Sequence, residues 1–285
     1  MASTDEDNGV SRLRWFHGDS RFRAADWRCG SADTRPHATE ASSRPAIAFT
    51  RRGAYRRHVG SATHLVDPGT AVFYPRWMEY RVSHPVPGGD RSLVVALSRR
   101  ALEDLRIARL PEGYAAFSPR SALDLRRVAL AAREGATLAV EELLVRLVGQ
   151  ALTTLCQSPR DRDRREGTAA AHRRAVERAR QTMAARYDDR LTLDEIARDT
   201  GYTATHLCEV FRHETGMTIH RHLSRLRLLV ALEGLEGTRS LTRLAYEVGF
   251  STPSHFATAF LREFGHPPSR LLPALAAEDV ARLRP

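Results

Sequence analysis

Thr192-Leu-Asp-Glu-Ile-Ala-Arg-Asp-Thr-Gly201-Tyr-Thr-Ala-Thr-His-Leu-Cys-Glu-Val-Phe211 is followed later in the chain by a stretch with the same pattern, Ser240-Leu-Thr-Arg-Leu-Ala-Tyr-Glu-Val-Gly249-Phe-Ser-Thr-Pro-Ser-His-Phe-Ala-Thr-Ala-Phe260. Up to the glycine the two stretches align at an offset of 48 residues, and beyond it the offset becomes 49. A repeat of this length indicates one supersecondary unit present twice.

Each copy has the signals of two helices joined by a tight turn. Thr192 and Ser240 are hydroxyl N-caps before an apolar-periodic run, and Glu195 completes a capping box in the first copy. Gly201 and Gly249 are placed to end the first helix with a positive φ. A second helix then begins near 204 and 252. A helical hairpin without DNA contact is the alternative for one copy, but two copies in register favour tandem helix-turn-helix units.

The double unit, together with the closing phrase Gly249-Phe-Ser…His255-Phe…Phe260-Leu-Arg-Glu-Phe-Gly265-His-Pro-Pro268-Ser, resembles the AraC/XylS family of bacterial transcription regulators. The resemblance covers about residues 171–273. It implies an all-α DNA-binding domain over 171–285, with helix-turn-helix units at 192–213 and 240–263. Leu261 and Glu209 depart from the family pattern, which has basic or other polar residues there.

The helix predicted over 217–235 joins the two units and would be about 28 Å long at 1.5 Å per residue. That length approaches the roughly 34 Å between two major-groove segments on one face of DNA. The outward positions at the start of each second helix are the expected DNA contacts. Arg212 and Arg262 suit phosphates, and Glu209 suits a cytosine amino group. The predicted DNA-binding residues are Thr203, Ala204, Thr205, Cys208, Glu209, Arg212, Ser251, Thr252, Pro253, Ser254, His255, Thr258 and Arg262.

The N-terminal part has a different pattern, with short extended runs separated by Gly and Pro. Such spacing favours a small antiparallel barrel, and Phe49-x-Arg51-x-Gly53-x-Tyr55 and His84-Pro85…Gly88-Gly89 resemble a cupin-like sensor domain of the same family. We therefore predict an α+β chain of two domains, with an arm at 1–20 and a barrel at about 30–115. The expected strands are 46–50, 54–58, 64–66, 71–74, 80–83 and 92–97.

Helices are expected over 99–106, 119–133 and 138–157, completing a sensor or dimerisation domain at 1–157. The periodic apolar residues of 138–157 fit either a cover for the barrel or a dimer seam, because periodicity does not choose between them. The polar, charge-alternating segment 158–170 is the predicted linker. An Arg-rich helix over 171–187 would precede the first helix-turn-helix unit, and a short helix would start at Pro267-Pro268.

Composition points to a cytoplasmic protein. The 285 residues suffice for two cores, no run of eighteen apolar residues or signal peptide is evident, and the three cysteines form no C-x-x-C pair. The net charge is +10, and every basic residue is Arg. Residues 170–285 hold 17 Arg and 14 acidic residues, or +3, against 27 and 20, or +7, elsewhere. The repeat, not the bulk charge, thus locates the DNA-binding domain.

The sequence favours a regulator over an enzyme. No G-x-S-x-G, phosphate loop or paired-carboxylate motif is present. His58, His64 and His84 lack the His-x-His of cupin metal centres, and His206 and His213 lack enough partners, so we expect no metal and no cofactor. A cupin-type enzyme with a helical interaction tail is the alternative, and a protein-binding tail without DNA contact is the third hypothesis. Expected partners are double-stranded promoter DNA and a small-molecule effector, with RNA polymerase and a second copy as further candidates.

Overall fold

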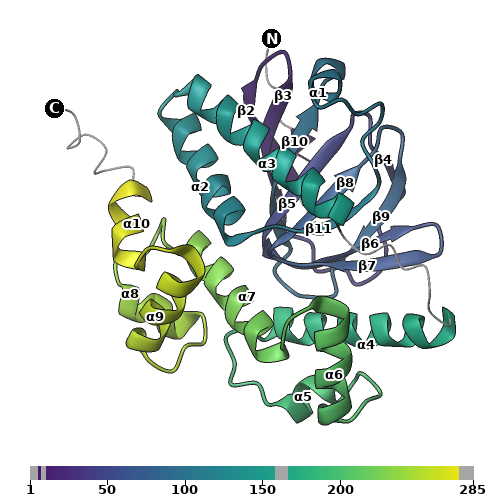
Figure 1. The fold of residues 1–285 in the computed structure, drawn as a ribbon, viewed down its shortest axis with the longest axis vertical. Coiled ribbons are helices and arrows are strands. Elements are labelled where there is room, and N and C mark those ends of the chain that lie inside the picture. Colours follow the sequence, from purple (N-terminus) through teal and green to yellow (C-terminus); the bar gives the residue numbers. More distant parts are fainter. Residues whose placement is uncertain (1–5, 8–10, 158–165, 276–285) are drawn as a thin grey trace. The chain divides into compact units, whose positions relative to one another are not determined.

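The computed structural model describes residues 6–7, 11–157 and 166–275, and the chain divides into two compact units, Met1–Pro159 and Arg160–Pro285 (Figure 1). The division falls inside the predicted linker, of which residues 158–165 lie outside the described residues. Helix α4 (Glu166–Ala185) begins within that segment, so residues 166–170 are helical where a linker was expected.

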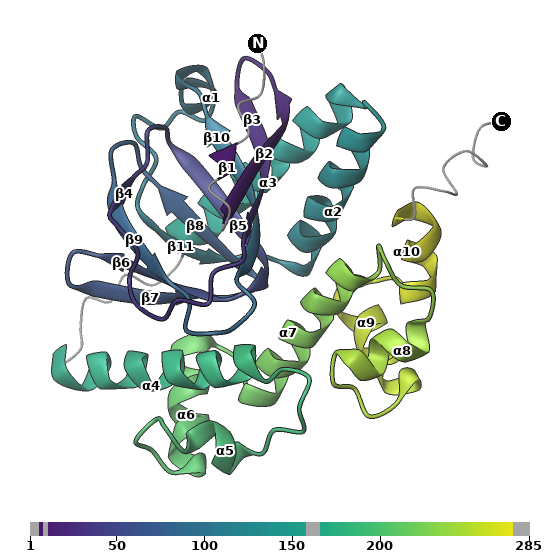
Figure 2. The ribbon, with the colours of Figure 1, turned by 180° about the vertical axis from the view of Figure 1, so that it is seen from behind.

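The N-terminal unit is built on two antiparallel sheets, as the sequence predicts for this half of the chain (Figure 2). The seven-stranded sheet has the order β1 (Glu6–Asp7), β2 (Ser11–Gly18), β3 (Phe22–Cys29), β10 (Asp90–Leu97), β5 (Ala46–Gly53), β8 (Thr70–Tyr74) and β11 (Gly113–Ala116). The four-stranded sheet has the order β4 (Glu40–Ala41), β9 (Glu79–Ser83), β6 (Tyr55–Val59) and β7 (Ala62–Val66). All six predicted strands are present.

The arm predicted at 1–20 is wrong for residues 11–18, which form strand β2 and pair with β3 along its length. The sheet thus starts well before the expected barrel limit at 30. Arginines at alternate positions of β2 dilute the apolar pattern that marks a strand. One of its aromatic residues is covered by a cation, since the Arg23 guanidinium lies 4.2 Å from the centre of the Trp15 ring.

Three helices complete the unit: α1 (Arg99–Asp104), α2 (Pro119–Arg133) and α3 (Thr137–Gln157). Helix α3 packs against α2 and β11. Its apolar face is buried, so α3 does act as a cover: Val140, Leu143, Leu144, Leu147, Val148 and Ala151. The buried carboxylate of Asp124 on α2 accepts two hydrogen bonds from Arg146 on α3, at 2.7 and 2.8 Å, and fixes the two helices to each other.

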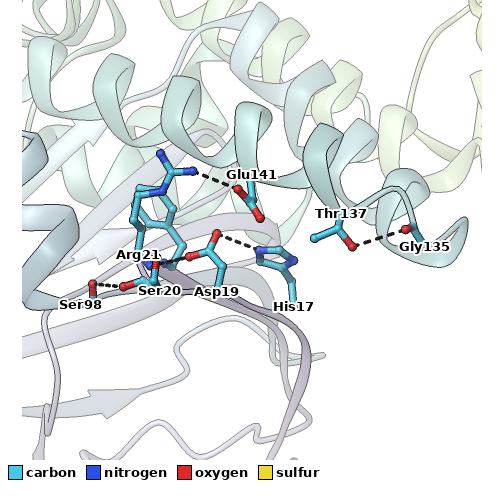
Figure 3. Close-up of polar contacts among 9 residues, drawn as sticks. His17, Asp19, Ser20, Arg21, Ser98, Gly135, Thr137 and Glu141 are labelled. Atoms are coloured by element: carbon cyan, nitrogen blue, oxygen red, sulfur yellow. Dashed lines mark hydrogen bonds and ion pairs between the residues drawn. The ribbon is translucent and has the colours of Figure 1, made fainter.

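The turn between β2 and β3 is fastened to α3 by side chains (Figure 3). Arg21 donates to Glu141 at 3.0 Å, and His17 lies 3.4 Å from Asp19. Burial acts to raise the pKa of Asp19, but hydrogen bonds from the backbone amides of Phe22 and Arg21 outweigh it and lower this pKa. The turn is therefore held in one conformation by its own carboxylate.

The C-terminal unit is helical throughout its described residues. After α4 come α5 (Leu193–Ala197), α6 (Ala204–Thr215), α7 (Ile219–Gly234), α8 (Leu241–Glu247), α9 (Pro253–Phe264) and α10 (Pro268–Leu275). Helix α7 lies between the α5–α6 pair and the α8–α9 pair (Figure 1). Its 16 residues span about 24 Å, somewhat less than the sequence predicts. Among the described residues, no helix is long and apolar enough to cross a membrane.

Candidate nucleic-acid interface

The two sequence copies have the same local structure. Gly201 (φ 81°) and Gly249 (φ 85°) both make the turn in the left-handed region, as predicted. The following helices, α6 and α9, have 12 residues each and end at Gly216 and Gly265, which are also left-handed. The extra residue that changes the offset from 48 to 49 lies in the second turn, between Gly249 and the N-cap of α9.

Hydroxyl side chains cap every one of these helices. Thr203 accepts from the His206 amide at 3.3 Å, and Thr252 accepts from the His255 amide at 3.2 Å. Thr192 and Glu195 form the predicted capping box. In the second copy Ser240 still caps α8, while Arg243, which replaces the box glutamate, pairs with Glu247 at 2.6 Å. The starts of α6 and α9 are therefore fixed, with the remaining first-turn amides directed outward.

One face of each second helix is buried and the other is exposed. Helix α6 buries Leu207, Val210 and Phe211, and α9 buries Phe256, Ala259, Phe260 and Phe264. Ala197 and Ala245 are buried where the first helix of each pair meets the second, which fits the need for a small side chain at a close crossing. Phe250 fills the second corner, but Tyr202 in the first is only half-buried and lies against the His206 ring at 4.7 Å between centroids.

The predicted contact residues lie on the exposed faces. Thr205 and Ser254, one on each helix, are both exposed. Ala204, Cys208 and Pro253 are half-buried. The other predicted contacts are exposed: Thr203, Glu209, Arg212, Ser251, Thr252, His255, Thr258 and Arg262. Each copy thus presents short polar side chains at the start of its second helix, followed by one arginine.

The two arginines are exposed and unpaired. In the part of the chain that the structure describes, neither Arg212 nor Arg262 has an ion-pair partner. Glu209, by contrast, lies 3.8 Å from His206 on the same helix. Guanidinium groups without a protein partner on the rim of a polar surface can receive an anion without first breaking an ion pair.

One element of the unit escapes prediction from the repeat. The segment between α4 and α5 crosses to the second copy, where Arg227 of α7 donates to the carbonyl of Tyr187 at 2.6 Å and of Asp189 at 2.7 Å. A Cβ on Gly249 would lie 2.8 Å from the carbonyl oxygens of Tyr187 and Asp188. The second turn is thus packed against backbone from the first half of the unit, whereas a Cβ on Gly201 would meet nothing within 4 Å.

A capped two-helix unit with a left-handed glycine turn and an exposed second helix defines a helix-turn-helix domain. A family profile described as "Helix-turn-helix domain" matches residues 196–273. The transcriptional activator RhaS of Escherichia coli is 36% identical over 83 residues, which are 29% of this chain and 30% of RhaS. Residues 196–273 belong to the AraC/XylS type of helix-turn-helix domain. The matched segment spans under a third of the curated relatives' length.

Two solved structures resemble the chain. The C-terminal domain of the response regulator AraT from Geobacillus stearothermophilus is 27% identical, with a TM-score of 0.34, over 36% of this chain and 86% of that domain. Fatty-acid-bound ToxT from Vibrio cholerae is 11% identical, with a TM-score of 0.38, over 92% of this chain and 98% of ToxT.

Proposed function

We propose that this protein is a sequence-specific DNA-binding transcription regulator that contacts two adjacent major-groove segments with α6 and α9. The observation that carries the proposal is the pair of capped helices with equivalent exposed polar faces. Major-groove recognition needs a helix whose first turns are free of core contacts, which both helices satisfy. The length of α7, about 24 Å, supports two neighbouring grooves because a helical turn of DNA is about 34 Å.

The side chains divide into two roles. Hydroxyl, thiol, imidazole and carboxylate groups would contact base edges, where Glu209 can accept from a cytosine amino group and the others form single hydrogen bonds. Thr203 and Thr252 each keep a hydroxyl proton to donate, because their oxygens already accept from the helix backbone. Arg212 and Arg262, with the first-turn amides, would bind phosphates.

The arginines give the sharpest test. In Arg212→Ala and Arg262→Ala, affinity for promoter DNA is expected to fall for all sequences, and the slope of log K against log salt should become shallower by about 0.9 for each phosphate that the variant no longer neutralises. Arg99→Ala is the matched control. It removes the same charge from α1 in the other unit, where Arg99 pairs with Glu103 at 2.8 Å. Unchanged affinity and slope in both test variants would leave a protein-binding tail as the better hypothesis.

The N-terminal unit is proposed to be a cupin-like sensor that binds a small effector. It holds a pocket of about 860 Å³, within the range of small-molecule sites. Trp77, at its edge, is 65% exposed and has a φ of 64°, a strained conformation for a large residue that is often found at binding sites. The pocket wall includes apolar and cationic side chains: Arg44, Arg76, Trp77, Leu97, Leu102 and Arg109.

This combination supports an effector with an apolar body and a carboxylate. Arg44 and Arg109 have no ion-pair partner among the described residues, and the Arg76 guanidinium lies 4.8 Å from the Trp77 ring centre. An aryl carboxylate such as phenylbutyrate is expected to quench the emission of Trp77, while its neutral amide should not, and Trp77→Phe should remove the response. Catalytic turnover of an added ligand would instead support the enzyme alternative. RNA polymerase and a second copy are proposed as further partners.

A further inference from the structure

A cluster of three ligand-type side chains is buried in the N-terminal unit, away from the pocket. Cys29, His84 and Asp90 are 7%, 2% and 6% exposed, respectively. Each offers one ligand atom, a sulfur, a ring nitrogen or a carboxylate oxygen, and these atoms lie within 4.8 Å of one another. In the described residues His84 is one of the few buried histidines, and it faces two groups that become anionic when deprotonated.

The surrounding backbone holds the cluster together. Asp90 and Cys29 are directly opposite partners in the β10–β3 ladder, so their side chains share one face of the sheet. The His84 amide donates to the carbonyl of Asp33 at 2.8 Å, which anchors the other end of the 84–90 loop. A Cβ on Gly89 would overlap the Cys29 carbonyl oxygen, so this loop passes directly over Cys29 and glycine is required there.

The hydrogen bonds of the cluster are incomplete. His84 Nε2 lies 3.0 Å from Asp90 Oδ1, and the Ser31 amide donates to Cys29 Sγ at 3.5 Å. The other ring nitrogen of His84 and the second oxygen of Asp90 have no hydrogen-bond partner. Leaving a buried polar atom unpaired costs about 1–3 kcal/mol, and an ion is one of the standard reasons for such a pair of atoms.

We propose that Cys29, His84 and Asp90 bind a divalent transition-metal ion, with Zn²⁺ the best fit. A thiolate, an imidazole and a carboxylate form a mixed set that suits a borderline-soft ion and excludes Mg²⁺ and Ca²⁺, which prefer oxygen ligands. Zn–N and Zn–S bonds of about 2.0 and 2.3 Å place bound ligands somewhat closer than 4.8 Å. Binding therefore draws the three side chains together by a small rotation and leaves one tetrahedral position for a fourth ligand.

The position of the site suggests a structural role. Its ligands come from the end of β3, the loop after β9 and the first residue of β10, so a bound ion would fasten that loop to the seven-stranded sheet. The site differs from the His-x-His pattern expected of a cupin metal centre, because its ligands are far apart in sequence and meet through the strand pairing.

The test uses the full-length chain, purified under reducing conditions and freed of metal with a chelator that is then removed. Titration with Co²⁺ is expected to saturate at one ion per chain and to give the charge-transfer absorption of a thiolate–cobalt bond. Competition with a chromophoric chelator measures the affinity for Zn²⁺. In Cys29→Ser the absorption should disappear, and the affinity should fall by more than the roughly 10–100-fold that removing a residue next to a ligand costs.

A double variant keeps the experiment decisive if Cys29→Ser does not fold. The chain has three cysteines, so Cys156→Ser/Cys208→Ser leaves Cys29 as the only thiol, and it changes residues outside the buried cluster. This variant should retain the full cobalt absorption. A folded wild-type chain without that absorption, or a double variant without it, would overturn the proposal and leave the cluster as a buried histidine–carboxylate pair beside a thiol.

Discussion

The two turn glycines provide a matched pair of substitutions with different expected costs. Gly201→Ala places a Cβ at φ 81° with nothing within 4 Å, so its cost is the left-handed conformation alone, about 1–2 kcal/mol. Gly249→Ala adds a clash, since its Cβ would lie 2.8 Å from two backbone carbonyl oxygens. The Tyr187 carbonyl is held by Arg227 and cannot retreat freely. Overpacking adds about 1–3 kcal/mol, for a total of about 2–5 kcal/mol.

The assay separates the units by their spectroscopic probes. Trp15, Trp27 and Trp77 are the only tryptophans and lie in the first unit, so tryptophan fluorescence follows its unfolding, while far-ultraviolet circular dichroism is dominated by the helical second unit. Denaturant midpoints by circular dichroism should fall for both variants and further for Gly249→Ala, with the fluorescence midpoint unchanged. Equal costs for the two variants would refute the argument that the 187–189 segment packs on the second turn.

Polar contacts give three further predictions. Thr203→Ala and Thr252→Ala should each destabilise the helical unit by about 1 kcal/mol in the same assay, while the Ser variants retain most of the cap. Asp124→Asn should destabilise the N-terminal unit by about 3 kcal/mol, read by tryptophan fluorescence, because it leaves Arg146 without its buried partner. Arg127→Ala, which removes an exposed partner of the same carboxylate, should cost under about 1 kcal/mol. Finally, backbone hydrogen bonding at Thr192 and the ion pair with Arg186 lower the pKa of Glu195 from 4.5 to about 2. Its stabilising contribution is therefore fully present above pH 4.5 and disappears as the pH falls to about 2, a dependence that Glu195→Gln should abolish in acid titrations followed by circular dichroism.

The C-terminal half can be predicted closely because its signals are local. N-cap hydroxyls, a glycine with positive φ and a helical apolar period act within a few residues of one another, and the repeat gives each signal twice. The contact of the 187–189 segment with Gly249 is not predictable, because it joins residues about sixty positions apart through backbone atoms that carry no sequence signal. The exposed faces of α6 and α9 follow from the helical period, so their polar residues can be identified from the sequence.

The N-terminal half is less predictable because its structure depends on non-local pairing. Strand β2 is specified by its partner β3 more than by its own arginine-interrupted pattern, so the sequence alone indicates an arm. Cys29, His84 and Asp90 are separated by up to about sixty residues and meet only through the register of β10 with β3. Period and motif searches detect neither kind of feature.

The extra residue in the second turn bears on the DNA that such a protein would select. Thr203 and Thr252 cap equivalent helices with φ angles of −67° and −145°, so the chain enters α6 and α9 along different paths. The exposed residues also differ, with Thr205 and Glu209 in one helix and Ser254 and His255 in the other. On the proposed function, one chain would occupy an operator with polarity, composed of two dissimilar sequence elements in a set order. Reversing that operator beside a promoter would turn the bound protein end for end and present a different helix to whatever is bound downstream.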